Sequence, residues 1–491
     1  MSRPLQLTQW QHELESRFPQ LPTRVVFVLA LYSFAMILAH LSGLSTVSFF
    51  LASSFGWSYD AVRKRLSEFY KEAPAKSGFR HGSKRRDFDV STCFAPLLRW
   101  ILSLWSGRQL ALAIDVTNLG ERFHVLCVSV VVRGNAIPVA WKVLYGGMKD
   151  PWNPYWQDLL HNLKEAVPSD WTVIVLSDRG LESPWLFRVI KDQGWHPLMR
   201  VKKSGKFRPK GWGRFYSLAD LVKCVGGYMY AEGRAYTGEK LPCTLLAQFA
   251  EGYDEPWFLL TDLPPEMGSA VWYAFRAWIE QGFKVIKSGG WDWEKTRMED
   301  PQRVERLWLV MAVATLWVVA IGADDEVRQE AEEERKRSAR RMAESLEETR
   351  KRLEQEQLRR ERQREAQRTR QARKQRREAL KEEQREKARS EKRAKKSQEG
   401  TGREQGHDAG CDKTVGVAAT AKTTNPRKRV EKEKGAKART HRVSRRGLAV
   451  LSALWQKGQN CLPQHLHPEP WPKPCHHAST VTEEEFLAHQ T

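Results

Sequence analysis

One segment of the chain cannot contribute to any hydrophobic core. Between Asp324 and Gly400, 47 of 77 residues are charged, and glycine, proline and aromatic residues are nearly absent. The remaining residues favour helix, and many opposite charges stand three or four positions apart. Because sustained apolar heptads are absent, the pattern predicts a solvated charged helix or a weak coiled coil over residues 324–400.

The residues after this segment predict little structure. Glycine, threonine, lysine and alanine without periodicity indicate a disordered basic tail over residues 401–491, which includes one short apolar helix at Gly447–Gln456. A patch of cysteines and histidines near the end, from Cys461 to His477, is either a zinc site of irregular spacing or part of that tail. The folded protein is therefore expected mainly within residues 1–323.

The charge of the chain points to a polyanionic partner. There are 81 lysines and arginines against 59 aspartates and glutamates, a formal charge of +22, and the segment 324–400 contributes only 7 of it. An excess of this size is unusual for a protein that acts on small neutral metabolites. The seven cysteines are few and scattered, which argues against a disulfide framework and favours a reducing compartment.

An apolar run near the N-terminus, Val25–Leu41, is the one stretch that resembles a membrane span. Its 17 residues are at the short limit for crossing a bilayer and are interrupted by Ser33 and His40. We therefore interpret it as a buried helix and expect no membrane partner, with a membrane anchor as the alternative.

Residues 1–90 are predicted to form a helical, DNA-binding domain. Helices are expected at Pro22–His40, Ser45–Ser54 and Ser58–Tyr70, with Ser58 as N-cap of the third. A helix, a tight turn at Gly56 and a basic helix are compatible with a helix-turn-helix. An ordinary helical bundle with a solvated basic face explains the same pattern.

From residue 91 to residue 323 the pattern changes to that of an α/β domain. Three β-rich runs are followed by a helix, a strand, a helix and another strand; in order these are Leu110–Val116, Phe123–Arg133, Ile137–Val143, Pro154–Ala166, Trp171–Leu176, a helix that ends near Gly194, and His196–Val201. This order predicts a ribonuclease-H-like mixed sheet, with a β-rich insertion at about residues 202–263.

Two aspartates are expected to converge in that topology. Asp115 closes the first strand and Asp178 follows the fourth, and these strands are neighbours in a ribonuclease-H-like sheet. One or two carboxylates with phosphate oxygens form the usual surroundings of Mg²⁺. Each aspartate alone is equally explained as a turn or cap residue.

A third carboxylate lies on a predicted helix, Val271–Ser288. Four polar residues of this helix, Tyr273, Arg276, Glu280 and Lys287, fall within about 60° of one another at 100° per residue, on an otherwise apolar helix. The stripe predicts a site in which Glu280 completes a metal cage while the cations hold phosphates. The alternative is an amphipathic helix with its wet side outward.

These residues resemble a known family. The spacing Tyr273-x2-Arg276-x3-Glu280-x6-Lys287 matches the Tyr-Arg-Glu-Lys signature of the insertion-sequence-four family of bacterial DDE transposases, and Asp115 and Asp178 resemble its two catalytic aspartates. The resemblance covers about Leu110–Gly322 and leaves the N-terminal segment and the charged tail unassigned.

The resemblance implies a transposase that cleaves transposon ends and joins the 3′-hydroxyl to target DNA. Asp115, Asp178 and Glu280 would hold two Mg²⁺ ions, with Mn²⁺ as a substitute, while Tyr273, Arg276 and Lys287 would grip the DNA strand. It further implies double-stranded DNA as partner, a homodimer on DNA, and a cytoplasmic, nucleoid-associated location in a bacterium. A catalytically silent DNA-binding scaffold and a metal-dependent DNA nuclease remain the alternatives.

Further cations are candidates for DNA contacts. Arg179 follows the second aspartate directly, and a basic run that includes Lys202, Lys203 and Lys206 opens the insertion with aromatic residues interleaved. A solvated loop explains the basic run equally well.

Overall fold

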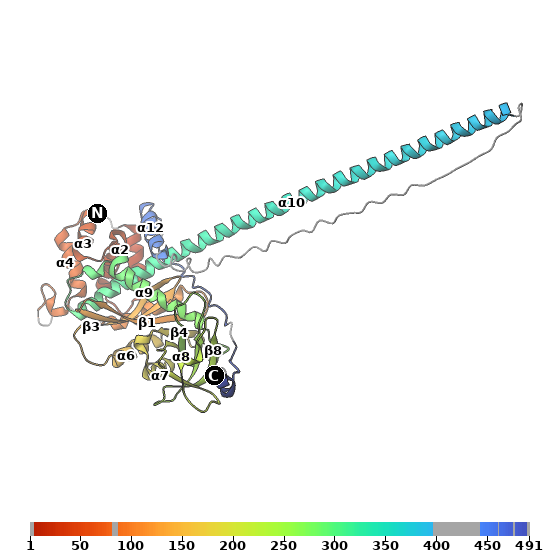
Figure 1. Ribbon diagram of the computed structural model, residues 1–491. Coiled ribbons are helices and arrows are strands. Elements are labelled where there is room, and N and C mark those ends of the chain that lie inside the picture. The colour runs from red at the N-terminus through yellow and green to blue at the C-terminus, as the bar shows by residue number, and fades with distance from the viewer. Residues whose placement is uncertain (1–3, 81–86, 396–441, 460, 475–476, 489–491) are drawn as a thin grey trace. The chain divides into compact units, whose positions relative to one another are not determined.

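The computed structural model describes residues 4–80, 87–395, 442–459, 461–474 and 477–488. The chain divides into two compact units, residues 1–329 with 431–491, and residues 330–430. The first unit contains the mixed sheet and all the predicted site residues (Figure 1).

A single sheet of ten strands forms the centre of the first unit. Its order is β3-β2-β1-β4-β5-β10-β9-β8-β6-β7, in which β1 pairs antiparallel with β2 and parallel with β4. The strands are β1 (Gln109–Leu119), β2 (Phe123–Val132), β3 (Asn135–Tyr145), β4 (Thr172–Ser177), β5 (His196–Arg200), β6 (Lys206–Pro209), β7 (Tyr216–Ser217), β8 (Tyr228–Ala235), β9 (Leu241–Gln248) and β10 (Trp257–Thr261).

The first five strands have the order predicted for a ribonuclease-H-like core. β2 and β3 are buried along almost their whole length, because helices lie on both sides of the sheet. Figure 1 shows α9 (Ala277–Lys284) on one side and α6 (Asn153–Lys164) and α7 (Pro184–Asp192) on the other. The insertion strands do not form a separate sheet, since β10 pairs antiparallel with β5 and extends the core sheet.

The N-terminal part is helical. It consists of α1 (Leu5–Arg17), α2 (Thr23–Ala39), α3 (Leu44–Phe55), α4 (Tyr59–Tyr70), the 3₁₀ turns η1 (Ala73–Ala75) and η2 (Val90–Cys93), and α5 (Phe94–Ser103). Gly56 ends α3 in the left-handed region at φ 64°, which suits a residue without a side chain, and the Ser58 hydroxyl caps α4. These are the turn and the N-cap that the sequence predicted.

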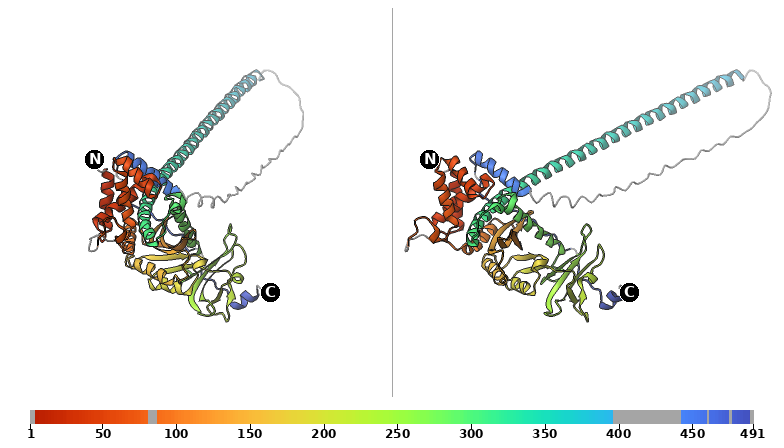
Figure 2. Two further views of the ribbon diagram at one scale, coloured as in Figure 1. Left: turned by 90° about the vertical axis from the view of Figure 1, so that its left-hand side faces the viewer. Right: turned by 60° about the vertical axis from the view of Figure 1, so that its left-hand side comes forward.

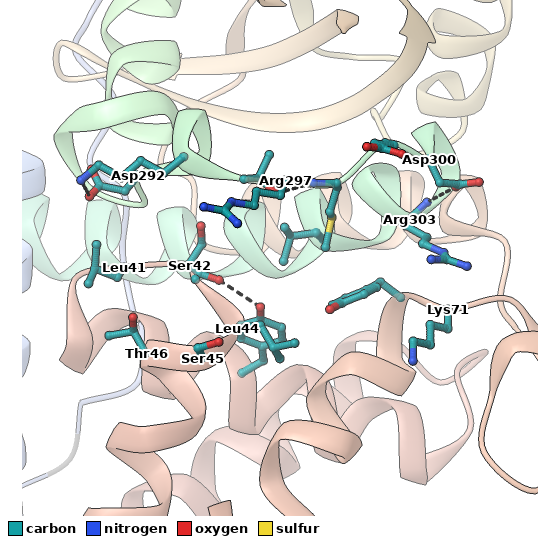
Figure 3. Close-up of a pocket in the computed structure, with 18 of the residues that line it drawn as sticks. Leu41, Ser42, Leu44, Ser45, Thr46, Lys71, Asp292, Arg297, Asp300 and Arg303 are labelled. Carbon is teal, nitrogen blue, oxygen red and sulfur yellow. Dashed lines mark hydrogen bonds and ion pairs between the residues drawn. The ribbon is translucent and has the colours of Figure 1, made fainter. Parts of the chain in front are cut away.

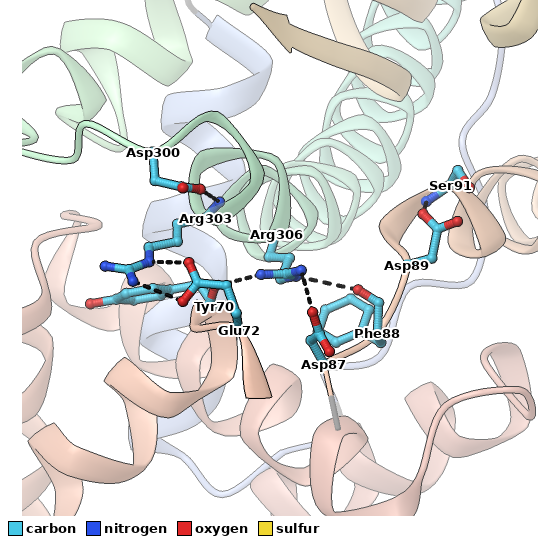
Figure 4. Close-up of polar contacts among 9 residues, drawn as sticks. All are labelled: Tyr70, Glu72, Asp87, Phe88, Asp89, Ser91, Asp300, Arg303 and Arg306. Carbon is cyan, nitrogen blue, oxygen red and sulfur yellow. Dashed lines mark hydrogen bonds and ion pairs between the residues drawn. The ribbon is translucent and has the colours of Figure 1, made fainter. Parts of the chain in front are cut away.

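Two arginines of α10 (Pro301–Lys395) join the N-terminal part to the rest of the unit (Figure 4). Arg303 forms two bonds of 2.8 Å with the carboxylate of Glu72. The side chain of Arg306 is only 7% exposed and donates to the carbonyl oxygens of Tyr70 and Phe88 and to Asp87. Because three acceptors surround one buried guanidinium, this junction depends on Arg306.

Helix α10 begins before the charged segment and continues through it. Residues 304–321 are buried almost throughout, whereas the side chains from Glu330 to Arg389 are exposed. α10 is long and apolar enough to cross a membrane, as the bent pair α2–α3 would be if counted as one span, but 94% of its apolar window is buried within the protein. Burial of that kind is expected of a core helix.

The structure differs from the predicted disordered tail over residues 442–488, while 396–441 lie outside the described residues. α12 (Arg442–Gln456) crosses α10 so closely that a Cβ at Gly447 would stand 1.9 Å from the Val318 carbonyl oxygen. Its Trp455 ring packs 5.7 Å from Phe34 of α2, and both views of Figure 2 show α12 beside the N-terminal helices. These contacts bury the apolar side of α12. The overall composition of residues 401–491 did not indicate this packing.

The segment after α12 continues along the first unit. Leu466 donates its N–H to Leu104, the Trp272 indole donates to the Pro472 carbonyl at 2.7 Å, and α13 (Glu483–Ala488) packs Phe486 on Trp212. His467 bonds Asp324 at 2.6 Å and Cys461 is buried, so each has a structural role. Cys475 and His476 lie outside the described residues.

Candidate active site

Parallel pairing of β1 and β4 brings the two predicted aspartates to the same end of the sheet. Ile114 lies opposite Ser177, so Asp115 and Asp178 follow neighbouring positions. The Asp115 side chain is 16% exposed and accepts the N–H of Val116, while that of Asp178 is 38% exposed and accepts the N–H of Gly180. Both carboxylates retain oxygens that can face a common ligand.

Glu280 comes from α9, which lies close against the sheet. A Cβ at Gly282 would stand 2.8 Å from the Ala136 side chain, so a glycine allows the close approach of α9 to β3. The continuous helix predicted over residues 271–288 is wrong in detail. The structure has a 3₁₀ segment η4 (Ala270–Arg276), then α9, then a π segment η5 (Val285–Gly289).

The three carboxylates meet on one guanidinium. Nη2 of Arg276 lies 2.8 Å from Oδ2 of Asp115 and 3.4 Å from Oδ2 of Asp178, and Nη1 donates to Glu280. The Arg276 side chain is 12% exposed, and its buried Nε has no hydrogen-bond partner. Three acidic residues from remote parts of the chain are therefore held around a single positive charge.

Burial and mutual repulsion make this cluster costly to ionise. The pKa of Asp115 is raised to about 6, mainly by burial and to a smaller extent by the charges of Asp178 and Glu280, while the charge of Arg276 opposes the rise. With three carboxylates and one guanidinium the cluster is negative when fully ionised. A second positive charge would therefore stabilise it.

The other two signature residues lie on either side of the cluster. Tyr273 is buried, its ring packs against Trp257, and burial raises its pKa to about 12, so it stays a hydrogen-bond donor at neutral pH. Lys287, in η5, lines a hollow of about 480 Å³ with Asn118, Arg122 and Glu294. Burial lowers the pKa of Lys287, and the charges of Glu294 and, to a smaller extent, Asp115 oppose this.

Four predicted DNA contacts lie away from the cluster. Arg179 pairs with Glu255 at 3.1 Å, so its charge is directed away from the carboxylates. Lys202, Lys203 and Lys206 are exposed at and before β6, where the insertion begins. The structure thus places Arg179 in an ion pair, Lys206 at the start of β6, and Lys202 and Lys203 exposed before it, and their contact with DNA stays a prediction.

Sequence reasoning missed two residues beside the site. Arg200 at the end of β5 pairs with Glu255 at 2.6 Å, and its guanidinium lies over the Tyr273 ring at 5.9 Å from the ring centre. Neither residue belongs to a motif, and only the pairing of β5 with β10 brings them together. No local signal in the sequence could have identified them.

The chemistry of the three carboxylates fits a hard divalent cation, but the distances between them do not. Carboxylate oxygens are the ligands that Mg²⁺ prefers, and these already surround a positive charge. Among the described residues, however, no group of three histidine, cysteine, aspartate or glutamate side chains stands at metal-binding spacing. The reason is visible in the contacts, since Arg276 lies between the carboxylates.

A comparison with protein families supports the interpretation of the chain as a transposase. Residues 119–317 match the family of the transposase DDE domain, which supports a DDE transposase. The matched segment includes Asp178 and the whole Tyr-Arg-Glu-Lys signature, and it begins just after Asp115.

A solved structure, the piggyBac transposase synaptic complex with hairpin DNA, aligns at 12% identity over 63% of this chain and 71% of its own, with a TM-score of 0.34. A TM-score of that size establishes no common fold. A search of curated proteins finds no match.

Proposed function

We propose that the protein is a DNA transposase of the insertion-sequence-four type, which cuts the ends of its element and joins the freed 3′-hydroxyls to target DNA. The observation that carries the proposal is the convergence of Asp115, Asp178 and Glu280 on Arg276. In phosphoryl transfer a protein contributes mainly positioning and charge neutralisation. A carboxylate cluster bordered by cations is suited to both.

The three carboxylates would hold the divalent cations. When bound, Mg²⁺ or Mn²⁺ would stabilise charge on the phosphate oxygens and favour the ionised form of the attacking water or hydroxyl. Before cations enter, Arg276 holds the carboxylates together. With cations bound, the Arg276 guanidinium would be available to a DNA phosphate, as Lys287 and the Tyr273 hydroxyl would be from either side.

A metal-dependent nuclease is the nearest alternative, because the same cluster serves an attack by water. Purified full-length protein should nick duplex DNA in Mg²⁺ and transfer strands to a second duplex. The Asp178→Asn variant should lose both activities by at least about 10²-fold. Nicking without strand transfer would favour the nuclease, and equal rates for wild type and variant would leave only a DNA-binding scaffold.

The assembly and the location belong to the same proposal. From the resemblance to the insertion-sequence-four family we further propose a homodimer on paired transposon ends and a bacterial, nucleoid-associated location. Finding inverted repeats on both sides of the coding region would support this proposal independently, because a plain nuclease has no need of them.

A further inference from the structure

A cleft of about 1130 Å³ lies in the first unit, apart from the carboxylate cluster (Figure 3). One wall consists of residues 41–46 at the start of α3, with Arg63 and Lys71 from α4 and its end. The opposite wall is the segment 292–300 and Arg303, which leads into α10. The cleft therefore lies between the N-terminal helices and the segment that follows the Tyr-Arg-Glu-Lys signature.

The cations that line the cleft are unequally neutralised. Lys295 pairs with Asp292 at 2.6 Å, and Arg303 pairs with Glu72. Three others form no salt bridge with any carboxylate in the described part of the chain, namely Arg63, Lys71 and Arg297. Charged groups left without partners on two facing walls indicate a ligand of opposite charge.

The carboxylates of the cleft do not cancel these three charges. Asp300 accepts the backbone N–H of Arg303 at 2.9 Å, and Glu299 is exposed to solvent. The hydroxyls of Ser45 and Thr46 are exposed on the wall opposite Arg297. Hydroxyl and cationic donors together are the groups that contact DNA phosphates.

A line of cations connects the cleft to the carboxylate cluster. Arg122 donates to the carbonyl oxygens of Thr296 and Met298, both of which line the cleft. Arg122 also lines the smaller hollow that contains Lys287, which lies in η5, directly after the helix α9 that contains Glu280. Positive charge thus continues from the carboxylates to the cleft, which suits an extended polyanion better than a small anion.

We propose that this cleft binds backbone phosphates of the same DNA duplex whose scissile phosphate lies at the carboxylate cluster. The inference rests on the proposed function for the identity of that duplex, but the contact itself requires no cleavage. It assigns Arg63, Lys71 and Arg297 as phosphate contacts, and it gives the basic face of α4 a place in binding.

The test measures DNA binding without chemistry. Full-length protein in EDTA is titrated against a fluorescein-labelled duplex of about 30 base pairs, by anisotropy, at several salt concentrations. The triple variant Arg63→Gln/Lys71→Gln/Arg297→Gln should bind at least about 10-fold more weakly, and the slope of log K against log salt should decrease by about 2 to 3. A charge-matched control, Arg99→Gln/Lys191→Gln/Lys223→Gln, removes three exposed cations outside the cleft.

The outcomes separate this inference from the proposed function. Equal affinities and slopes for the two triple variants would overturn the cleft as a binding site, whatever the nicking activity. A specific loss in the cleft variant would support it even if wild-type protein failed to nick DNA, which would overturn the proposed function alone.

A second measurement needs no variant. Acetylation of lysines in wild-type protein, followed by mass spectrometry, should show Lys71 protected by the duplex while Lys223 remains reactive. Protection of Lys71 by 10 mM inorganic pyrophosphate but not by the duplex would overturn DNA as the ligand.

Discussion

The guanidinium of Arg276 lies 2.8 Å from the carboxylate of Asp115, although the two residues are 161 positions apart in the chain. The same side chain also contacts Asp178 and Glu280, so it holds the position at which a divalent cation would neutralise the cluster. This relationship leads to predictions that do not depend on turnover.

Replacing the guanidinium should favour metal binding. In the Arg276→Gln variant a cation no longer competes with a resident positive charge, so Mn²⁺ should bind about 10-fold more tightly in the absence of DNA. Titration of the full chain by calorimetry checks this. Arg276→Lys, which keeps the charge, is the control and should resemble wild type, whereas weaker Mn²⁺ binding by Arg276→Gln would contradict the prediction.

Removing one carboxylate should not destabilise the fold. Because three carboxylates face one arginine, Asp178→Asn relieves repulsion, and the Tm without metal should stay the same or rise. Circular dichroism melting measures this. A fall of several degrees would mean that the attraction between Asp178 and Arg276 outweighs the repulsion among the three carboxylates.

Stability without metal should fall as pH rises from about 4 to 6. The pKa of Asp115 is raised from 3.8 to about 6, so the folded state binds a proton that the unfolded state has already released. Protonation therefore favours folding in this window, by at most about 3 kcal/mol, and the effect levels off above pH 6. Urea unfolding at several pH values should show this slope, and Asp115→Asn should reduce it.

The junction with the N-terminal helices should depend more on Arg306 than on Arg303. Arg306→Ala leaves two carbonyl oxygens and Asp87 without their donor and should cost about 3 kcal/mol. Arg303→Ala removes a more exposed pair and should cost about 1 kcal/mol. The midpoints of urea unfolding compare the two, and equal losses would show that burial of Arg306 does not matter.

Packing of α12 should tolerate no side chain at its crossing with α10. The Gly447→Ala variant places a Cβ against the Val318 carbonyl oxygen, so α12 should loosen and become sensitive to limited proteolysis. Ala449→Ser, at an exposed position of the same helix, is the control and should remain as resistant as wild type.

Local sequence patterns predicted the helices and strands of the core. The geometry of the candidate active site depends on contacts between residues that are far apart in the sequence. Alternating apolar residues predicted β1 to β5 and their order. The spacing from Tyr273 to Lys287 predicted that polar groups would gather on one side, although the segment is not a single helix. The contact of Arg276 with both aspartates could not be predicted, because it depends on how closely α9 approaches β3.

The short apolar helix at Gly447–Gln456 was predicted and forms part of α12, but the packing of the C-terminal residues escaped prediction for a different reason. Their composition resembles a flexible tail, and the feature that orders α12 is a glycine on another helix, Gly322, whose Cβ would stand 2.2 Å from the Val443 carbonyl oxygen. A pattern read along one segment contains no information about a partner more than a hundred positions away.

That crossing also sets the timing of folding during synthesis. Gly322 leaves the ribosome before Gly447 does. At about 5 to 20 residues per second, roughly 6 to 25 seconds pass before α12 is available to pack against the apolar side of α10. Throughout that interval the nascent chain exposes the apolar side of α10, which α12 covers only after it has been synthesised.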